Sequence, residues 1–401
     1  MVPADAAVHP PREATTAPPV APLPHWRALP PPRHGLTAIV VVPARNEAAR
    51  IGQALEALAT QRDLAGEALP HSAFEILVLV NNSDDGTAAI ARLVARDHPA
   101  LVCHVVEAAL EAPQANVGYV RRQLMDAGLD RLRRAGGSPR AVIASTDGDS
   151  RVAPDWLAAQ LAAIDAGADA VGGRIVGEPV DASLLGVRRA QRVDLAHALL
   201  RSRLESALLP DAADPWPRHH QHFGASLAVT ARAYADVGGV PTVPFLEDEA
   251  LVQALRRRDW AVRHCPRVRV GTSSRFDGRA EVGLAWQLRQ WADRTSEYHD
   301  AMVEPAGSWI EGLGALAELR RRRTTGAAGD PMLDARLGVA TGVSASLLAA
   351  GGPFGAMRET VEQLRREALV ACGGLVPLSI DLPDLRAACR RLARPSRTVR
   401  A

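Results

Sequence analysis

The sequence contains no lysine: all 47 basic side chains are arginine, against 45 acidic ones, over 401 residues. This excludes enzymes that form a Schiff base through lysine, and P-loop proteins that need a lysine for phosphate. Any phosphate bound here must contact arginine, backbone amides or a metal ion. A net charge of +2 also argues against a protein that coats nucleic acid, so we expect no nucleic-acid partner.

Cysteine is scarce and dispersed as well. The four cysteines, Cys103, Cys265, Cys372 and Cys389, form no C-x-x-C pair, which argues against a zinc ribbon and a disulfide framework. The N-terminus carries Asp5 and no continuous apolar run, so no secretory signal is indicated. We therefore expect a protein of the reducing cytoplasm.

The chain divides by composition. Ten of the 29 prolines fall within residues 1–34, which predicts a disordered leader rich in proline and alanine. Over residues 35–300 apolar runs alternate with helical patterns, which predicts an α/β domain with a mostly parallel sheet. We expect a nucleotide-binding half over 35–150 and an acceptor and catalytic half over 151–300. Residues 301–401 predict a helical region that extends the core or forms a homodimer contact.

One stretch of the C-terminal region, residues 337–357, is uncharged and long enough to span a bilayer. Glycines, serines and Pro353 interrupt it, so we favour a buried helical hairpin over a membrane helix. Peripheral association with a membrane stays open.

Polar residues follow three of the expected strands. The apolar runs predict strands over residues 37–43, 74–81, 101–107 and 141–146. Ligands of such sheets bind at the carboxyl ends of the strands. The polar segments 43–47, 81–87 and 147–150 stand there; each alone is ordinary turn or capping chemistry, but three in succession indicate one binding site.

Asp147 and Asp149 are separated by a single glycine at a predicted strand end. Mg²⁺ or Mn²⁺ takes one or two protein carboxylates and completes its shell with water and phosphate oxygens. The pair therefore suits a metal ion that bridges a diphosphate.

Five short motifs stand in a fixed order along the chain: Pro43-Ala-Arg-Asn-Glu47, Asn81-Asn-Ser-Asp-Asp-Gly-Thr87, Asp147-Gly-Asp149, Gly224-Ala-Ser226 and Glu247-Asp-Glu-Ala-Leu251. The set resembles the family 2 glycosyltransferases, over about residues 37–300. That family has the GT-A fold and uses nucleotide-diphosphate-sugar donors. The resemblance implies an inverting, metal-dependent transfer of one sugar to a hydroxyl of a small-molecule or lipid-linked acceptor.

The resemblance also implies residues for the donor. Pro43, Arg45 and Glu47 would line the nucleoside pocket, together with Asn81 and Asp85. Asn81 stands where the family usually has an aspartate; an amide still bonds a base edge, but a preference for uridine becomes less secure. Asp85 is equally well explained as a helix cap.

Arginines are the expected cations near the diphosphate. Arg121 or Arg122 falls where the family places such a cation. Arg275 and Arg279, in a polar loop after a predicted strand, are candidates to clamp the diphosphate or an anionic acceptor. The alternative for each is an exposed surface arginine. Some relatives have a histidine metal ligand near residues 272–274, so the third ligand stays open here.

Asp248 is the expected general base and Glu247 its positioning partner, because sugar transfer needs a carboxylate to take the proton of the acceptor hydroxyl. The alternative is that acidic residues simply suit a helix N-terminus. His219, His220 and His222 do not match a zinc motif, and we expect them to line the acceptor pocket or to lend one metal ligand.

Two alternatives to a glycosyltransferase remain at this point. One is a noncatalytic protein that binds nucleotide sugars. The other is a sugar nucleotidyltransferase, which would need a glycine-rich signature that segment 43–47 lacks. Within the family, Gln290 stands where processive members carry an arginine before Trp291, so long-chain polysaccharide synthesis is disfavoured.

Overall fold

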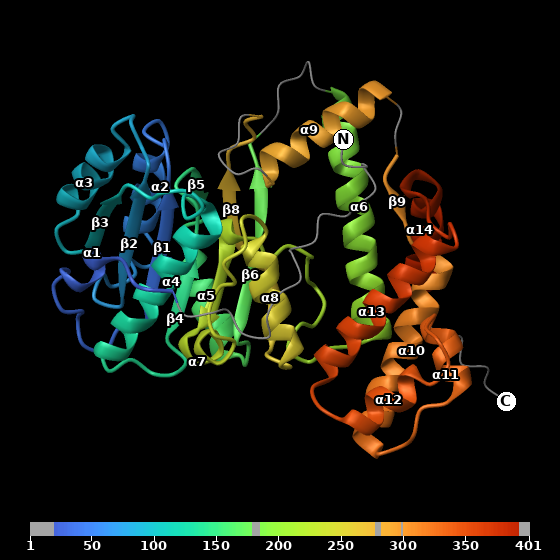
Figure 1. Cartoon of the computed structure of the whole chain (residues 1–401). Helices are drawn as coiled ribbons and strands as arrows, with labels where there is room; N and C mark the ends of the chain where they lie inside the picture. Colours follow the sequence, from blue (N-terminus) through green and yellow to red (C-terminus); the bar gives the residue numbers. More distant parts are fainter. Residues whose placement is uncertain (1–19, 179–184, 277–281, 298–299, 393–401) are drawn as a thin grey trace.

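A computed structural model of the chain describes residues 20–178, 185–276, 282–297 and 300–392. Figure 1 shows a sheet with helices on both faces, and beside it a group of helices that includes the C-terminal ones, drawn in orange and red. The α/β class with a helical C-terminal extension is confirmed.

The large sheet has eight strands in the described part of the chain, in the order β3-β2-β1-β4-β7-β6-β8-β5. Four of its seven pairings are parallel, and β5 and β7 run antiparallel to their neighbours. The strands are β1 (Ala38–Ala44), β2 (Phe74–Asn81), β3 (Val102–Ala108), β4 (Val142–Ser145), β5 (Ser150–Val152), β6 (Ala170–Gly177), β7 (Leu227–Thr230) and β8 (Val262–Thr272).

Helices cover both faces of this sheet, which is why its central strands are continuous apolar runs. One face packs on α2 (Ile51–Ala59), α3 (Thr87–Asp97) and α5 (Trp156–Asp165). The other face packs on α1 (Pro24–Arg27), α4 (Val117–Arg134), α7 (Ala231–Asp236) and α8 (Glu247–Arg257). A short 3₁₀ turn, Gly224–Ser226, precedes β7. The four strands predicted from the apolar runs are confirmed to within about two residues.

The leader predicted as disordered over residues 1–34 needs correction in its second half. Trp26 lies on α1 and is buried in the core beside α4. The backbone N–H of Leu23 donates to Gln123 Oε1 at 2.9 Å, and Gln123 Nε2 donates to Ala21 O at 2.8 Å. A single aromatic anchor thus orders a proline-rich segment; residues 1–19 lie outside the described part.

The C-terminal region is helical, and α6 (Leu185–Leu208) packs with it, against α9, α10 and α14. Its elements are α9 (Leu284–Glu297), β9 (Met302–Val303), α10 (Ala306–Thr325), α11 (Pro331–Leu337), α12 (Val343–Ala350), α13 (Phe354–Ala371), β10 (Val376–Pro377) and α14 (Leu378–Leu392). β9 and β10 form a separate antiparallel pair. These helices bury apolar side chains on one another within one chain.

The uncharged stretch over residues 337–357 is divided among three helices, because Gly338, Gly342 and Gly351 adopt left-handed backbone angles at their ends. Among the described residues, no helix is both long enough and apolar enough to cross a membrane.

A buried ion pair between α4 and β2 gives a test of the fold. Arg131 Nη2 lies 2.5 Å from Glu75 Oε2, and both side chains are at most 3% exposed. We expect Arg131→Ala to lower the free energy of unfolding by about 3–5 kcal/mol, because it leaves a buried carboxylate without its partner. Arg134→Ala, which breaks an exposed pair with Asp130 on the same helix, should change little. Equal losses in urea unfolding would contradict this assignment.

Candidate functional site

A cavity of about 2550 Å³ opens at the carboxyl ends of β1 and β4 and runs along α8 toward α6 and α13. It exceeds the roughly 300–1000 Å³ of a typical ligand site, so it has room for a donor and an acceptor. Ten of the predicted site residues line it: Pro43, Arg45, Glu47, Asn81, Arg121, Asp147, Asp149, Glu247, Asp248 and Arg275.

Two predicted donor residues lie outside the residues that line this cavity. Asp85 accepts hydrogen bonds from the backbone N–H of Thr87 and of Ala48, and so ties the loop after β2 to the loop after β1. Arg122 pairs with Asp126 at 2.5 Å and donates to a backbone carbonyl, that of Val240, at 2.9 Å. Both hold structure at these positions. Arg279, the remaining predicted clamp, lies outside the described residues.

Arg121 joins Asp147, which follows β4, to the first turn of α8. Its Nη2 lies 2.9 Å from Asp147 Oδ1, and its Nε lies 2.8 Å from Glu247 Oε1. Its Nη1 donates to Ser145 Oγ and, at 3.1 Å, to Gly224 O. Burial alone would lower the pKa of this guanidinium, but the surrounding carboxylates raise it. Arg121 is therefore a fixed positive charge at the centre of the site.

Arg275 occupies the opposite side of the acidic pair. It contacts both carboxylate oxygens of Glu47, and its Nη2 lies 3.3 Å from Asp149 Oδ2. Burial, and then the charges of Asp147 and Glu47, raise the pKa of Asp149 to about 6. The carboxylates here thus repel one another, and Arg275 relieves this only in part.

The residues present fit a divalent cation. Carboxyl groups outnumber guanidinium groups here by five to two: Glu47, Asp147, Asp149, Glu247 and Asp248 against Arg121 and Arg275. In the described part of the chain, no group of three or more His, Cys, Asp or Glu side chains is arranged to hold a metal. A cation at Asp147 and Asp149 would therefore complete its shell with phosphate and water oxygens.

Asp248 is buried on the first turn of α8, and its carboxylate is held by backbone groups. The N–H of Gly224 donates to Oδ2 at 2.6 Å, and the N–H of Glu249 donates to Oδ1 at 2.7 Å. Burial, and then the charge of Glu247, raise the pKa of Asp248 to about 7. A carboxyl group with this pKa can accept a proton near neutral pH.

The residue before α8 has an unusual backbone. Leu246 has φ +56°, in the left-handed region that leucine rarely adopts, and it lines the cavity. Such a conformation persists only where its surroundings hold it, and it is frequent at functional sites. Here it turns the chain so that the side chains of Glu247 and Asp248 face the cavity.

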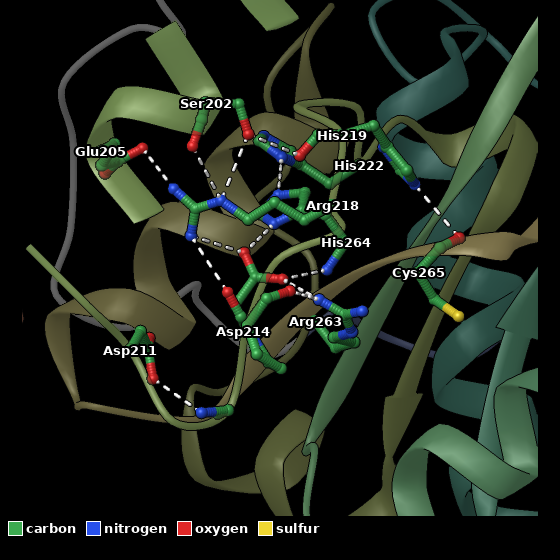
Figure 2. Close-up of polar contacts among 12 residues, drawn as sticks. Ser202, Glu205, Asp211, Asp214, Arg218, His219, His222, Arg263, His264 and Cys265 are labelled. Atoms are coloured by element: carbon green, nitrogen blue, oxygen red, sulfur yellow. Dashed lines mark hydrogen bonds and ion pairs between the residues drawn. The ribbon is translucent and has the colours of Figure 1, made fainter. Parts of the chain in front are cut away.

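The histidines form a polar cluster in place of a metal site (Figure 2). His222 Nδ1 lies 3.0 Å from His264 Nε2, and its Nε2 lies 2.5 Å from Glu249 Oε2. His264 Nδ1 in turn lies 2.7 Å from Asp214 Oδ2. His219 faces the carbonyl of Cys265 at 3.2 Å. His219, His220 and His222 line the cavity, as expected, beside α8.

The comparisons with known proteins fit this geometry. Residues 39–109, which include β1, β2 and the loops after them, match the family model "Glycosyl transferase family 2". The match supports the glycosyltransferase class that the ordered motifs predict. No curated protein sequence matches the chain.

Two solved glycosyltransferase structures match the chain at low similarity. Mannosyltransferase PcManGT from Pyrobaculum calidifontis, in complex with GDP-Man and Mn²⁺, is 19% identical over 86% of this chain and 92% of that chain, with a TM-score of 0.41. TarS 1–349 from S. aureus, in complex with UDP-GlcNAc, is 18% identical over 73% of this chain and 75% of that chain, with a TM-score of 0.40. At this distance neither substrate nor residue roles transfer.

Several contacts of the site could not be predicted from the sequence. Asp214 and His264 are 50 positions apart, and His222 and Glu249 are 27 apart, so no local spacing marks either pair. The hydrogen bond from Arg121 to Gly224 O, just before β7, could not be predicted either. Glu249 lies within the motif Glu247–Leu251 and could be placed near the site, but its contact with His222 could not.

Gly224 gives a test of how tightly the site is packed. A Cβ at this position would collide with the guanidinium of Arg121, which cannot move aside because Asp147 and Glu247 hold it. We expect Gly224→Ala to lower the free energy of unfolding by about 1–3 kcal/mol, measured by urea denaturation. Gly271→Ala is the matched control, because its Cβ would have its nearest neighbour at 3.8 Å. Two equally stable variants would show that the site is loosely packed.

Proposed function

We propose that this protein is a family 2 glycosyltransferase that inverts the anomeric centre and depends on a divalent metal. It would move one sugar from a nucleotide-diphosphate donor to a hydroxyl of a small-molecule or lipid-linked acceptor. The observation that carries the proposal is that Arg121 bonds both Asp147 and Glu247. A metal-binding strand end and a carboxylate base on α8 then share one cavity.

The donor would lie along the carboxyl ends of β1, β2 and β4. Pro43, Arg45, Glu47 and Asn81 line this end of the cavity, where a nucleoside would bind. Arg275, from the loop after β8, would exchange part of its contact with Asp149 for the diphosphate, to which a guanidinium binds through two N–H groups.

Asp147 and Asp149 would hold Mg²⁺ or Mn²⁺. When bound, the cation neutralises the negative charge that grows on the diphosphate as it leaves. The chain adds fixed positive charge of its own, because Arg121 is buried beside Asp147 and stays protonated. Because the sequence contains no lysine, the positively charged side chains near the diphosphate would be arginine guanidinium groups.

Asp248 would act as the general base. Its carboxylate takes the proton of the acceptor hydroxyl, and the acceptor oxygen bonds to the anomeric carbon as the bond to the diphosphate breaks. One attack from the face opposite the leaving group inverts the anomeric centre.

A cytoplasmic location stays a prediction. The four cysteines are free thiols, which a reducing compartment favours.

The base assignment predicts the behaviour of Asp248→Asn. We expect donor binding to persist and transfer to fall by about 10²- to 10⁴-fold, because the amide cannot accept the proton. Product formation with an excess of acceptor, and donor affinity by calorimetry, measure the two separately. Asp211→Asn is the control, since Asp211 lines the cavity but its carboxylate accepts from the nearby N–H of Ala213. Transfer at the wild-type rate in Asp248→Asn would refute the assignment of Asp248 as the base.

The metal assignment predicts the behaviour of Asp149→Asn. In a thermal-shift panel of UDP- and GDP-sugars, we expect Mn²⁺ to increase stabilisation of the wild type, because only a true ligand stabilises by mass action. The variant should lose this Mn²⁺-dependent increase. Asp155→Asn, which removes a surface pair with Arg267, should keep it. An unchanged Mn²⁺ effect in Asp149→Asn would show that the cation binds elsewhere.

A further inference from the structure

Three carboxylates stand in succession on the first turn of α8, and two of them contact the side chain of an arginine or a histidine. Glu247 has the guanidinium described above, and Glu249 Oε2 lies 2.5 Å from His222 Nε2. Asp248, between them, is bound by two backbone N–H groups. The proposed base therefore stands between two carboxylates that each contact such a side chain.

The hydrogen bonds define the charge of His222. Asp214 accepts at 2.7 Å from His264, so His264 carries its proton on Nδ1. The other nitrogen of His264 is then an acceptor, and it faces two donors, Arg256 Nη2 at 3.3 Å and His222 Nδ1 at 3.0 Å. His222 Nε2 faces the carboxylate of Glu249, and that contact needs a second proton. With a proton on each nitrogen, His222 would be an imidazolium that donates to both of these partners.

The far end of this chain of contacts is anchored (Figure 2). Arg218 Nη1 and Arg263 Nη1 each lie 3.0 Å from a different oxygen of Asp214. Burial alone would raise the pKa of Asp214, but the hydrogen bond from His264 and the charge of Arg218 hold it well below its ordinary value. Burial lowers the pKa of His264 to about 4, so that ring stays neutral.

We propose that His222 is a positioning residue whose imidazolium neutralises Glu249, so that Asp248 can ionise and take the proton of the acceptor. This inference rests on the proposed role of Asp248 as the base. His222 also lies two residues before Gly224, whose N–H binds Asp248, so it fixes the loop that orients that carboxylate.

Other charged or titratable groups face these residues from each neighbouring element. Around His222 they are His220 on its own loop, His264 on β8, and Arg256 and Glu249 on α8. Around Asp248 they are Glu247 on its own helix and Arg121 on α4. Loss of the His222 charge leaves one more unbalanced carboxylate beside Asp248. That charge disfavours ionisation, so the base would work only at higher pH.

The pH dependence of kcat tests this charge balance in the full chain. The readout is release of nucleoside diphosphate from UDP-N-acetylglucosamine or GDP-mannose with Mn²⁺. We expect His222→Gln to move the acidic limb of the profile up by about one pH unit. The acidic limb should stay near that of the wild type in Glu249→Gln, where His222 becomes neutral. It should also return there in the variant that carries both His222→Gln and Glu249→Gln. In both variants the net charge of residues 222 and 249 is zero, as in the wild type.

His219→Gln is the matched control, because His219 lies in the same loop and its ring contacts backbone groups of Cys265 and Gln221. Its acidic limb should stay in place. A role in folding alone would lower the thermal stability of these variants without moving the limb, and without rescue in the double variant.

NMR of ¹⁵N-labelled histidine reads the charge of His222 without turnover, and it needs only the wild type and Glu249→Gln if His222→Gln fails to fold. We expect one ring with both nitrogens protonated at pH 7.5, which becomes neutral in Glu249→Gln. A neutral His222 in the wild type would overturn the proposal. The proposal would also be overturned if the acidic limb of His222→Gln did not move while Asp248→Asn had lost transfer. In that case the assignment of Asp248 as the base would still stand. Full transfer by Asp248→Asn would remove the base and this role together.

Discussion

The buried guanidinium of Arg121 is the interaction on which the site depends. A charge taken out of water is tolerated only where its donors are bound and its charge is balanced. Arg121 meets both conditions with groups from β4, from the acidic strand end, from the turn before β7 and from α8. Segments more than one hundred residues apart are therefore held at one point, and the two halves of the proposed chemistry share a common support.

The absence of lysine is visible in how such contacts are built. A guanidinium presents five donors in a planar fork, whereas an ammonium is a compact point charge. Arg121, Arg131, Arg218 and Arg275 each contact at least two different groups. In this chain the arginine-only composition therefore has a structural use, since one side chain joins several elements of the fold.

The sequence predicts the first half of the sheet well and the site only in part. Buried parallel strands are continuous apolar runs, and their carboxyl ends mark the ligand side, so Asp147 and Asp149 could be placed without coordinates. Arg121 and Arg122 could not be told apart, because neighbouring residues on a helix point in different directions that only packing reveals. The contact of Glu249 with His222 could not be predicted either, since His222 comes from another loop whose position depends on the whole fold.

Helix α6 links the candidate site to the C-terminal helices. It packs on α9, α10 and α14, and its Glu205 bridges Arg358 of α13 to Arg218, which holds the Asp214 that orders the histidines. A truncation at residue 300, where sequence composition suggests a boundary, would expose the apolar face of α6 and cut this bridge. The C-terminal helices thus form one packed unit with the candidate site, and an expression boundary or a domain exchange has to keep them.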